Sequence, residues 1–120
     1  QDIKKNELPI NLINKLNTKK FYLIKANTKS TSVYHILALV FRDIKLANKF
    51  KDFVQKSEVA ATFHYVPLHK SKMGIKFCKY KLPVTEGIFN RIVRLPLFSE
   101  MKQNEVNKIS YLIKNFTLKY

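Results

Sequence analysis

The stretch Val33-Tyr-His-Ile-Leu-Ala-Leu-Val-Phe41, followed by Arg42-Asp-Ile-Lys-Leu-Ala-Asn-Lys-Phe-Lys-Asp-Phe-Val54, decides the fold. Its first part is a near-continuous apolar run rich in β-branched and aromatic residues, which is typical of a buried strand. In its second part the apolar residues recur with helical spacing: Ile44, Ala47, Phe50 and Val54. Asp43 stands where an N-cap is needed. The pattern predicts a strand that leads into an amphipathic helix packed on a sheet.

The residues around this unit predict two further strands. Residues 21–26 form a short β-type run, and residues 60–66 are predicted to form a strand that ends at Pro67, which cannot donate to a sheet ladder. Within the predicted strand, Phe63 is the expected core residue, so Tyr65 is expected on the core side and His64 on the opposite face. Residues 67–84 are expected to be irregular, with Gly74 as the position suited to a positive φ.

Two more helices are predicted towards the end of the chain. Thr85 is the expected N-cap of a helix that carries Ile88, Ile92 and Val93 and stops at Pro96. The last helix is expected from about Asn104 to Asn115, and its buried face contains Val106, Ile109, Leu112, Ile113 and Phe116. This order predicts an α+β fold with a small, mostly antiparallel sheet, helices on one side, and a single domain over residues 1–120.

The net charge of +15 comes almost entirely from lysine, because only Arg42, Arg91 and Arg94 are arginines. Such a surface attracts polyanions, but readers of specific bases rely on the bidentate fork of arginine. We therefore expect only non-specific affinity for nucleic acid, although a free-standing basic nucleic-acid-binding module stays open as an alternative. For Arg91 and Arg94 two interpretations also stay open, surface ion pairs or contacts with another domain.

Cysteine content and hydropathy bear on the compartment. The single Cys78 cannot form an internal disulfide, which fits either a reducing cytoplasm or simply a small buried thiol. No apolar stretch approaches the roughly 20 residues that span a bilayer, and the N-terminus has no secretory apolar region. We therefore expect a cytoplasmic protein without a membrane partner.

Spacing of the reactive residues does not reveal a chemistry. His35, His64 and His69 lack the closely spaced cysteine or acidic partners typical of a zinc site, so we expect no metal. The sequence contains no phosphate-binding loop, no dinucleotide-binding glycine pattern and no nucleophile elbow. Composition and spacing alone leave the function open.

Three motifs, in order, resemble one family. They are His35–Asp43 (HILALVFRD), Phe63–His69 (FHYVPLH) with Gly74 and Phe77, and Leu82–Glu86 (LPVTE) followed by Arg91 and by Arg94–Phe98 (RLPLF). Together they resemble the C-terminal small domain of DegT/StrS sugar-nucleotide aminotransferases, and most of all the enzymes that aminate thymidine-diphospho-4-keto-6-deoxyglucose for cell-surface polysaccharides such as lipopolysaccharide. Lys72 and Met73 depart from the family pattern, which has proline and a small residue there.

The resemblance implies a pyridoxal phosphate (PLP) enzyme whose cofactor is held by a large domain upstream of the small one. It also implies a homodimer and a nucleotide-sugar substrate. By this resemblance residues 1–120 supply substrate-side walls, bind no PLP alone and are inactive alone; a non-functional fragment of a decayed gene stays open as an alternative. The expected substrate-binding residues are His64, Tyr65 and His69, with His69 turned towards the cleft after Pro67.

A domain separated from its partner should expose apolar surface, because patches of this kind on monomers mark interaction sites. We expect such surface around Leu12, Ile13 and Leu16, and around Met73 and Phe77.

Overall fold

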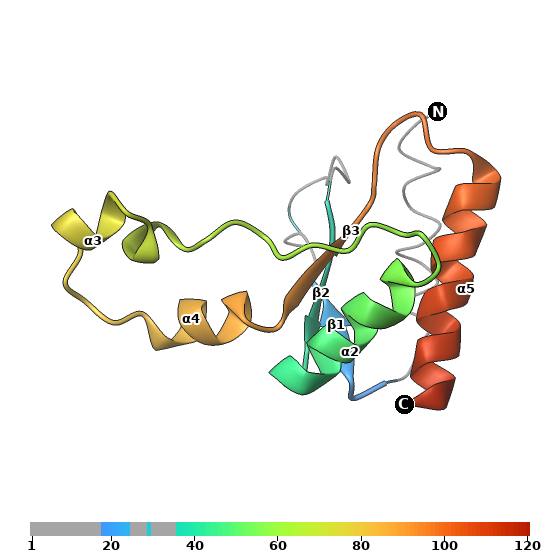
Figure 1. Ribbon diagram of the computed structural model, residues 1–120, viewed down its shortest axis with the longest axis horizontal. Helices are drawn as coiled ribbons and strands as arrows, with labels where there is room; N and C mark the ends of the chain where they lie inside the picture. Colours follow the sequence, from blue (N-terminus) through green and yellow to red (C-terminus); the bar gives the residue numbers. More distant parts are fainter. Residues whose placement is uncertain (1–17, 25–28, 30–35) are drawn as a thin grey trace.

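The computed structural model describes residues 18–24, 29 and 36–120 (Figure 1). In chain order its elements are β1 (Phe21–Leu23), β2 (Leu37–Phe41), α2 (Ile44–Gln55), the 3-10 helix η1 (Leu68–Lys70), α3 (Gly74–Phe77), α4 (Pro83–Phe89), β3 (Ile92–Leu95) and α5 (Gln103–Lys119). The expected patch around Leu12, Ile13 and Leu16, and His35, lie outside the described residues.

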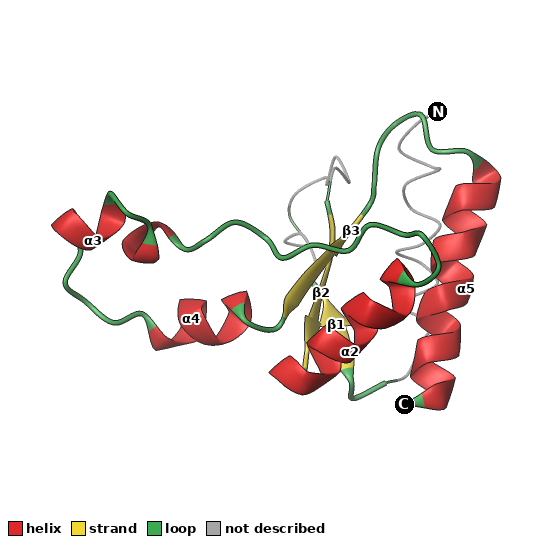
Figure 2. Ribbon diagram, in the orientation of Figure 1, coloured by secondary structure: helices red, strands yellow, loops and turns green. Residues whose placement is uncertain are grey.

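The sheet has three antiparallel strands in the order β1-β2-β3, with β2 at the centre (Figure 2). Leu39 of β2 lies opposite Leu23 of β1 and Val93 of β3. All five residues of β2 are buried, because strands β1 and β3 lie along its two edges and other side chains cover both faces of the sheet. The α+β prediction, with a small antiparallel sheet, is confirmed.

Helices α2 and α5 pack against one face of the sheet (Figure 1). Their core centres on Phe41, Phe50 and Phe116, none of which is exposed. The Phe50 and Phe116 rings are 5.0 Å apart at 77°, an edge-to-face arrangement that suits the charge distribution of aromatic rings. The opposite face of the sheet holds a smaller cluster of Ala38, Val40 and Ile92.

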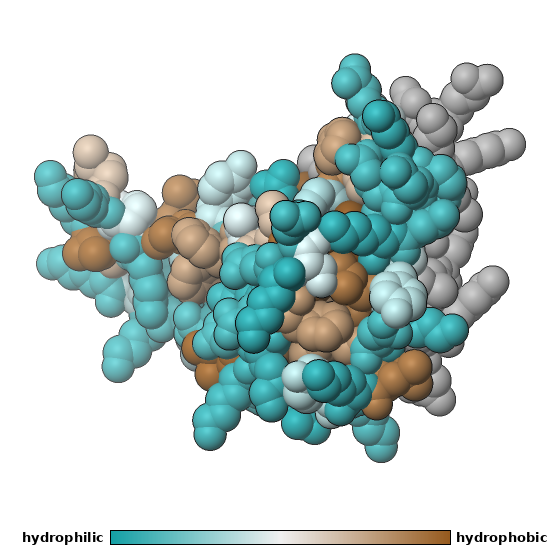
Figure 3. Space-filling model, turned by 45° about the vertical axis from the view of Figure 1, so that its right-hand side comes forward, coloured by the Kyte–Doolittle hydropathy of each residue, from teal (hydrophilic) through white to brown (hydrophobic). Residues whose placement is uncertain are grey.

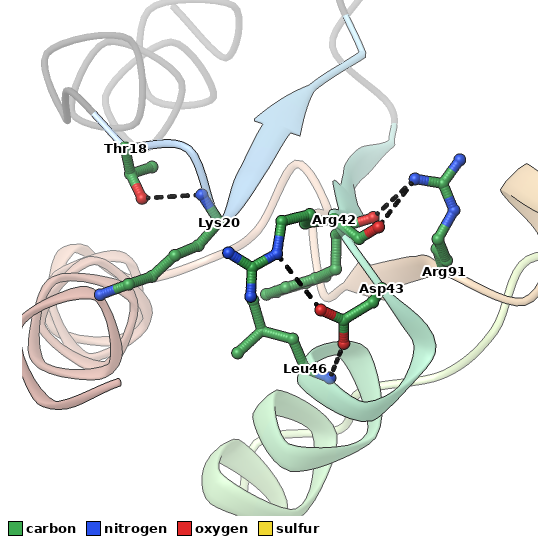
Figure 4. A network of polar contacts seen from close by, with 7 residues as sticks. Thr18, Lys20, Arg42, Asp43, Leu46 and Arg91 are labelled. Atoms are coloured by element: carbon green, nitrogen blue, oxygen red, sulfur yellow. Dashed lines mark hydrogen bonds and ion pairs between the residues drawn. The ribbon is translucent and has the colours of Figure 1, made fainter.

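The predicted α2 and α5 are confirmed. Asp43 caps α2, since its Oδ1 accepts a hydrogen bond of 2.8 Å from the Leu46 backbone N–H. That bond is the main reason why the pKa of Asp43 lies below its ordinary value, and Arg42, whose Nε lies 3.3 Å from Asp43 Oδ2, adds to it (Figure 4). The five residues predicted to form the apolar face of α5 are all buried.

The prediction for Ile92 and Val93 is wrong. Helix α4 ends at Phe89, and these two residues lie in β3 with exposed fractions of 8% and 0%. A short apolar run has no clear period of its own, so the open edge of β2 decides its conformation by offering backbone partners. Thr85 is likewise not an N-cap, because α4 begins at Pro83 and Thr85 lies within it.

The predicted strand over residues 60–66 is also wrong, apart from one isolated bridge between Thr62 and Arg94. After Thr62 the chain leaves β3 and has no strand beside it among the described residues. Phe63 is therefore 55% exposed and is not a core residue, and Tyr65 is 75% exposed and does not face the core. The expected alternation of faces requires a strand, and that strand does not form.

Residues 63–91, which we call the arm, extend away from the sheet and return into β3 (Figure 1). The prediction that residues 67–84 are irregular is wrong in part, since they contain η1, α3 and the start of α4. Gly74 does not have a positive φ. Glycine is needed there for close approach, because a Cβ on Gly74 would lie 1.6 Å from the Leu68 carbonyl oxygen.

Candidate functional site

The first part of the arm forms one wall of a cavity of about 260 Å³. Its polar side chains are His64, Tyr65 and Thr85, and the rest of its lining is apolar: Pro67, Ile88, Phe89 and Ile92. The ring centroids of His64 and Tyr65 are 4.9 Å apart. The sequence-predicted pair therefore lies together at the point where the arm leaves the sheet.

The imidazole of His64 has an unusual environment. Its Nδ1 is buried and has no hydrogen-bond partner among the residues that the structure describes. A buried polar atom without a partner costs free energy, so such atoms in native proteins call for an explanation such as binding or catalysis. His64 is thus the side chain of the arm best placed to bond to a group from outside the described residues.

A second cavity, of about 470 Å³, lies further along the arm. Leu68, His69 and Gly74 line it from η1 and α3, and Thr85 lines it from α4. Thr85 of α4 also lines the first cavity, so the two cavities are neighbours. The second cavity falls within the range of roughly 300–1,000 Å³ typical of small-molecule sites.

That His69 faces the substrate cleft stays a prediction, because His69 lines the second cavity but also makes a contact within the chain. Its side chain is only 8% exposed, and its Nε2 lies 3.1 Å from Glu86 Oε1. The other oxygen of Glu86 accepts a 2.7 Å contact from Lys70 Nζ. Lys70 and then His69 are the main causes that lower the pKa of Glu86 to about 2. The sequence pattern does not reveal this role of Glu86, because the LPVTE motif indicates only the start of a helix.

Arg91 closes the base of the arm. Its Nη1 donates to the carbonyl oxygens of Phe41, at 3.1 Å, and Arg42, at 3.2 Å (Figure 4). Its Nε donates to Gly87 O at 2.9 Å. The guanidinium therefore joins the end of β2 to the end of α4. These bonds to backbone oxygens lie within the chain, and the two interpretations left open for Arg91 stay predictions.

The arm also exposes much apolar surface, as predicted around Met73 and Phe77. Its most exposed apolar side chains are Leu68 at 85%, Phe77 at 82% and Tyr80 at 81%. Figure 3 shows hydrophobic side chains among hydrophilic ones on this projecting part of the molecule. Exposure of this kind on a projecting element indicates a surface that meets another part of a larger protein or a partner.

The two cavities of the arm do not fit PLP. The cofactor needs a lysine that forms a Schiff base and an acidic partner for the pyridine nitrogen. Each lysine within residues 18–24, 29 and 36–120 is exposed or half-buried, and none lines either cavity of the arm. We therefore assign no residue of the arm to PLP.

The part of the chain that the structure describes offers neither a metal site nor a membrane span. There, no three histidine, cysteine, aspartate or glutamate side chains are grouped so as to hold a metal ion. No helix in the same part is both long enough and apolar enough to cross a membrane.

Comparison with known proteins gives one family and a set of similar structures. Residues 6–114 match the DegT/DnrJ/EryC1/StrS aminotransferase family. The chain is similar to PseC of Helicobacter pylori, an aminotransferase involved in the biosynthesis of pseudoaminic acid, with a TM-score of 0.79 and 15% identity over 98% of this chain and 33% of PseC. It is also similar to S. venezuelae DesV, solved in complex with a ketimine intermediate, with a TM-score of 0.82 and 13% identity over 99% of this chain and 32% of DesV.

A DegT DnrJ EryC1 StrS aminotransferase from Brucella abortus is similar as well, with a TM-score of 0.77 and 18% identity over 98% of this chain and 31% of that one. The chain thus spans about a third of the length of each of these structures. At such identities the likeness concerns the fold.

Proposed function

Because this chain belongs to the DegT/DnrJ/EryC1/StrS aminotransferase family, we propose that residues 1–120 are the C-terminal part of an enzyme that transfers an amino group to a nucleotide-linked keto-deoxy sugar. The family is PLP-dependent, and PLP supplies the electron sink of amino transfer when it is bound. A large domain, in a homodimer, would hold the cofactor. We place the enzyme in the cytoplasm, and the amino sugar that it makes would serve the synthesis of cell-surface polysaccharides.

The observation that carries this proposal is the buried Nδ1 of His64, which has no partner among the described residues, beside the exposed Tyr65. A sugar presents hydroxyl and carbonyl groups, which can donate to or accept from an imidazole nitrogen. We assign direct contact with the sugar to His64 and Tyr65. His69 belongs to the same arm, but its Nε2 already faces Glu86, so we assign it an indirect role that is argued below.

The exposed apolar side chains of the arm support the proposed partner. An apolar surface that projects from the sheet stabilises an assembly when it packs against a second surface. In the proposed enzyme, that surface belongs to the large domain or to a second subunit. The charge of the arm adds a constraint, because five lysines lie within residues 70–81 and favour an acidic rim on the partner.

The test compares residues 1–120 alone with the longer polypeptide of which we propose they are the C-terminal part. Both are assayed for amino transfer from glutamate or glutamine to a panel of thymidine-diphosphate keto-deoxy sugars. The longer polypeptide should be active, and residues 1–120 should neither transfer an amino group nor retain a stoichiometric PLP aldimine after gel filtration. An inactive but folded longer polypeptide would favour the decayed-gene alternative.

Variants of the longer polypeptide test the site. His64→Ala should lower kcat/KM by about 100-fold or more, which corresponds to about 2.7 kcal/mol at the barrier. Tyr111→Phe is the matched control, because Tyr111 is exposed on α5 and lies outside the arm. Near-normal activity of His64→Ala, or a loss of stability that accounts for its defect, would show that His64 is structural.

The nucleic-acid alternative gains no support from a specific feature of the structure. Lysines are distributed over α2, the arm and α5. Binding to unrelated duplexes at physiological salt should therefore differ by much less than the ~10³ ratio of dedicated DNA-binding proteins. A ratio near that value would overturn the proposed function in favour of a binding module.

A further inference from the structure

The two limbs of the arm are joined through one carboxylate. Glu86 lies in α4, on the returning limb of the arm, which leads back into β3. His69 and Lys70 lie in η1, on the outgoing limb, which leaves the sheet. His69 and Glu86 are 17 residues apart in sequence. Oε1 of Glu86 faces His69 Nε2 at 3.1 Å and also accepts the Leu82 backbone N–H at 3.3 Å. Oε2 faces Lys70 Nζ at 2.7 Å. A single side chain thus ties η1 to α4 and holds the first turn of α4.

Apolar packing between the limbs is sparse, and its aromatic contact among the described residues is that of the Phe63 and Phe89 rings, whose centroids are 6.0 Å apart. None of the residues of η1, α3 or α4 is buried. A partly exposed ion pair such as that of Lys70 and Glu86 contributes little by itself. The bond from His69 differs, because the histidine side chain is 8% exposed and hydrogen bonds to a charged group are stronger when water is excluded.

One of these residues, His69, lines the larger of the two cavities of the arm. His69 lines that cavity together with Leu68 and Phe77, and Thr85 and Leu82 line it from the other limb. Its walls therefore come from both limbs, and their separation depends on what joins them. Only the contacts of Glu86 join η1 to α4 through side-chain hydrogen bonds among the described residues of the arm.

We propose that His69, Lys70 and Glu86 form a clasp that fixes the spacing of the two limbs and thereby holds the cavity of about 470 Å³ in shape. His69 is then a positioning residue of the arm and not a direct ligand of the sugar. The clasp does not depend on the proposed substrate, since it follows from contacts within this chain. Its failure and the failure of the proposed function are therefore distinguishable.

Cys78 provides a built-in probe of the clasp. It is the only cysteine of the chain, it is half-buried, and it lines the same cavity as His69. The rate at which a water-soluble maleimide labels Cys78 reports how often the limbs separate. Loss of one hydrogen bond to a charged group in His69→Leu should raise that rate about tenfold. His69→Gln should restore it to near the native rate, because its amide Nε2 offers a donor close to the position of the imidazole Nε2.

His64→Leu is the matched control, since His64 lies in the arm but lines the other cavity. It should label Cys78 at the native rate. Trypsin, which cleaves after the arm lysines, gives a second measurement: cleavage between residues 70 and 81 should accelerate in His69→Leu and in Glu86→Leu, and the melting temperature of the sheet and α5 should stay nearly unchanged.

Three results would overturn the clasp. Native labelling and native cleavage in His69→Leu would mean that the limbs hold together without it. Failure of His69→Gln to restore the native rate would mean that the imidazole acts by its shape and not by its bond to Glu86. A fall in melting temperature as large as that of a core substitution, in both His69→Leu and Glu86→Leu, would mean that these residues stabilise the whole domain and not the arm.

Discussion

Phe116→Ala should be the most destabilising single change that we can derive from the core. Phe116 has no exposed surface, and its ring lies 5.0 Å from that of Phe50 and 4.9 Å from that of Tyr120. Substitution of a buried phenylalanine by alanine typically costs about 3–5 kcal/mol, from lost burial together with the cavity left behind. Because several rings surround Phe116 and close aromatic pairs add to burial, we expect a loss of about 4 kcal/mol.

Urea unfolding of residues 1–120, followed by far-UV circular dichroism, measures this loss. With an m-value of about 2 kcal/mol per molar urea, the midpoint should fall by about 2 M while m stays constant. Leu118→Ala is the control, since Leu118 lies on the same helix and is 76% exposed; it should change stability by less than about 0.5 kcal/mol. A loss below about 1.5 kcal/mol for Phe116→Ala, with m unchanged, would refute the view that α5 is anchored through this ring.

Three further predictions concern single positions. The pKa of Glu86 is lowered from 4.5 to about 2, so its contacts stabilise the arm fully above pH 4.5, and this stabilisation is lost as the pH falls towards 2. An NMR titration of the Glu86 carboxyl carbon should show a midpoint below about 3. A midpoint near 4.5 would contradict the contacts. Glu58 has a φ of 60°, a left-handed conformation that is unfavourable for a residue with a Cβ. Glu58→Gly should therefore raise the free energy of unfolding by about 1 kcal/mol in the same urea assay. An unchanged free energy of unfolding would mean that Glu58 is not strained in solution. Gly74→Ala would place its Cβ 1.6 Å from the Leu68 carbonyl oxygen, so η1 and α3 should separate and tryptic cleavage of the arm should accelerate. Gly87→Ala is the control: its Cβ would meet no atom within 4 Å, so the rate of tryptic cleavage should not change.

The family resemblance rests on local motifs, and the family match confirms it. The substrate role of His64, Tyr65 and His69 stays a prediction, but their arrangement differs from the one expected. The pattern around Phe63 is typical of a strand, whereas the chain there has a single bridge at Thr62 and then leaves the sheet. A local pattern cannot tell whether a neighbouring strand is present to pair with it.

The residues of the clasp show the same limit. His69 and Glu86 are far apart in sequence, and neither lies in a motif whose spacing predicts their contact. Local pattern indicates a substrate ligand at one position and part of a helix start at the other. Their contact arises because the arm folds back on itself, and this places η1 beside α4.

The sequence by itself determined the elements whose signal is local: the buried run that forms β2, the Asp43 cap of α2, and the apolar face of α5. In these segments periodicity and capping chemistry act within a few residues, so no distant partner is needed. Only the tertiary structure decided that Ile92–Leu95 is a strand, that Gly74 serves close approach, and that His69 meets Glu86. These outcomes depend on which backbone edge or side chain from elsewhere in the chain lies nearby, and the sequence of a short segment does not specify that neighbour.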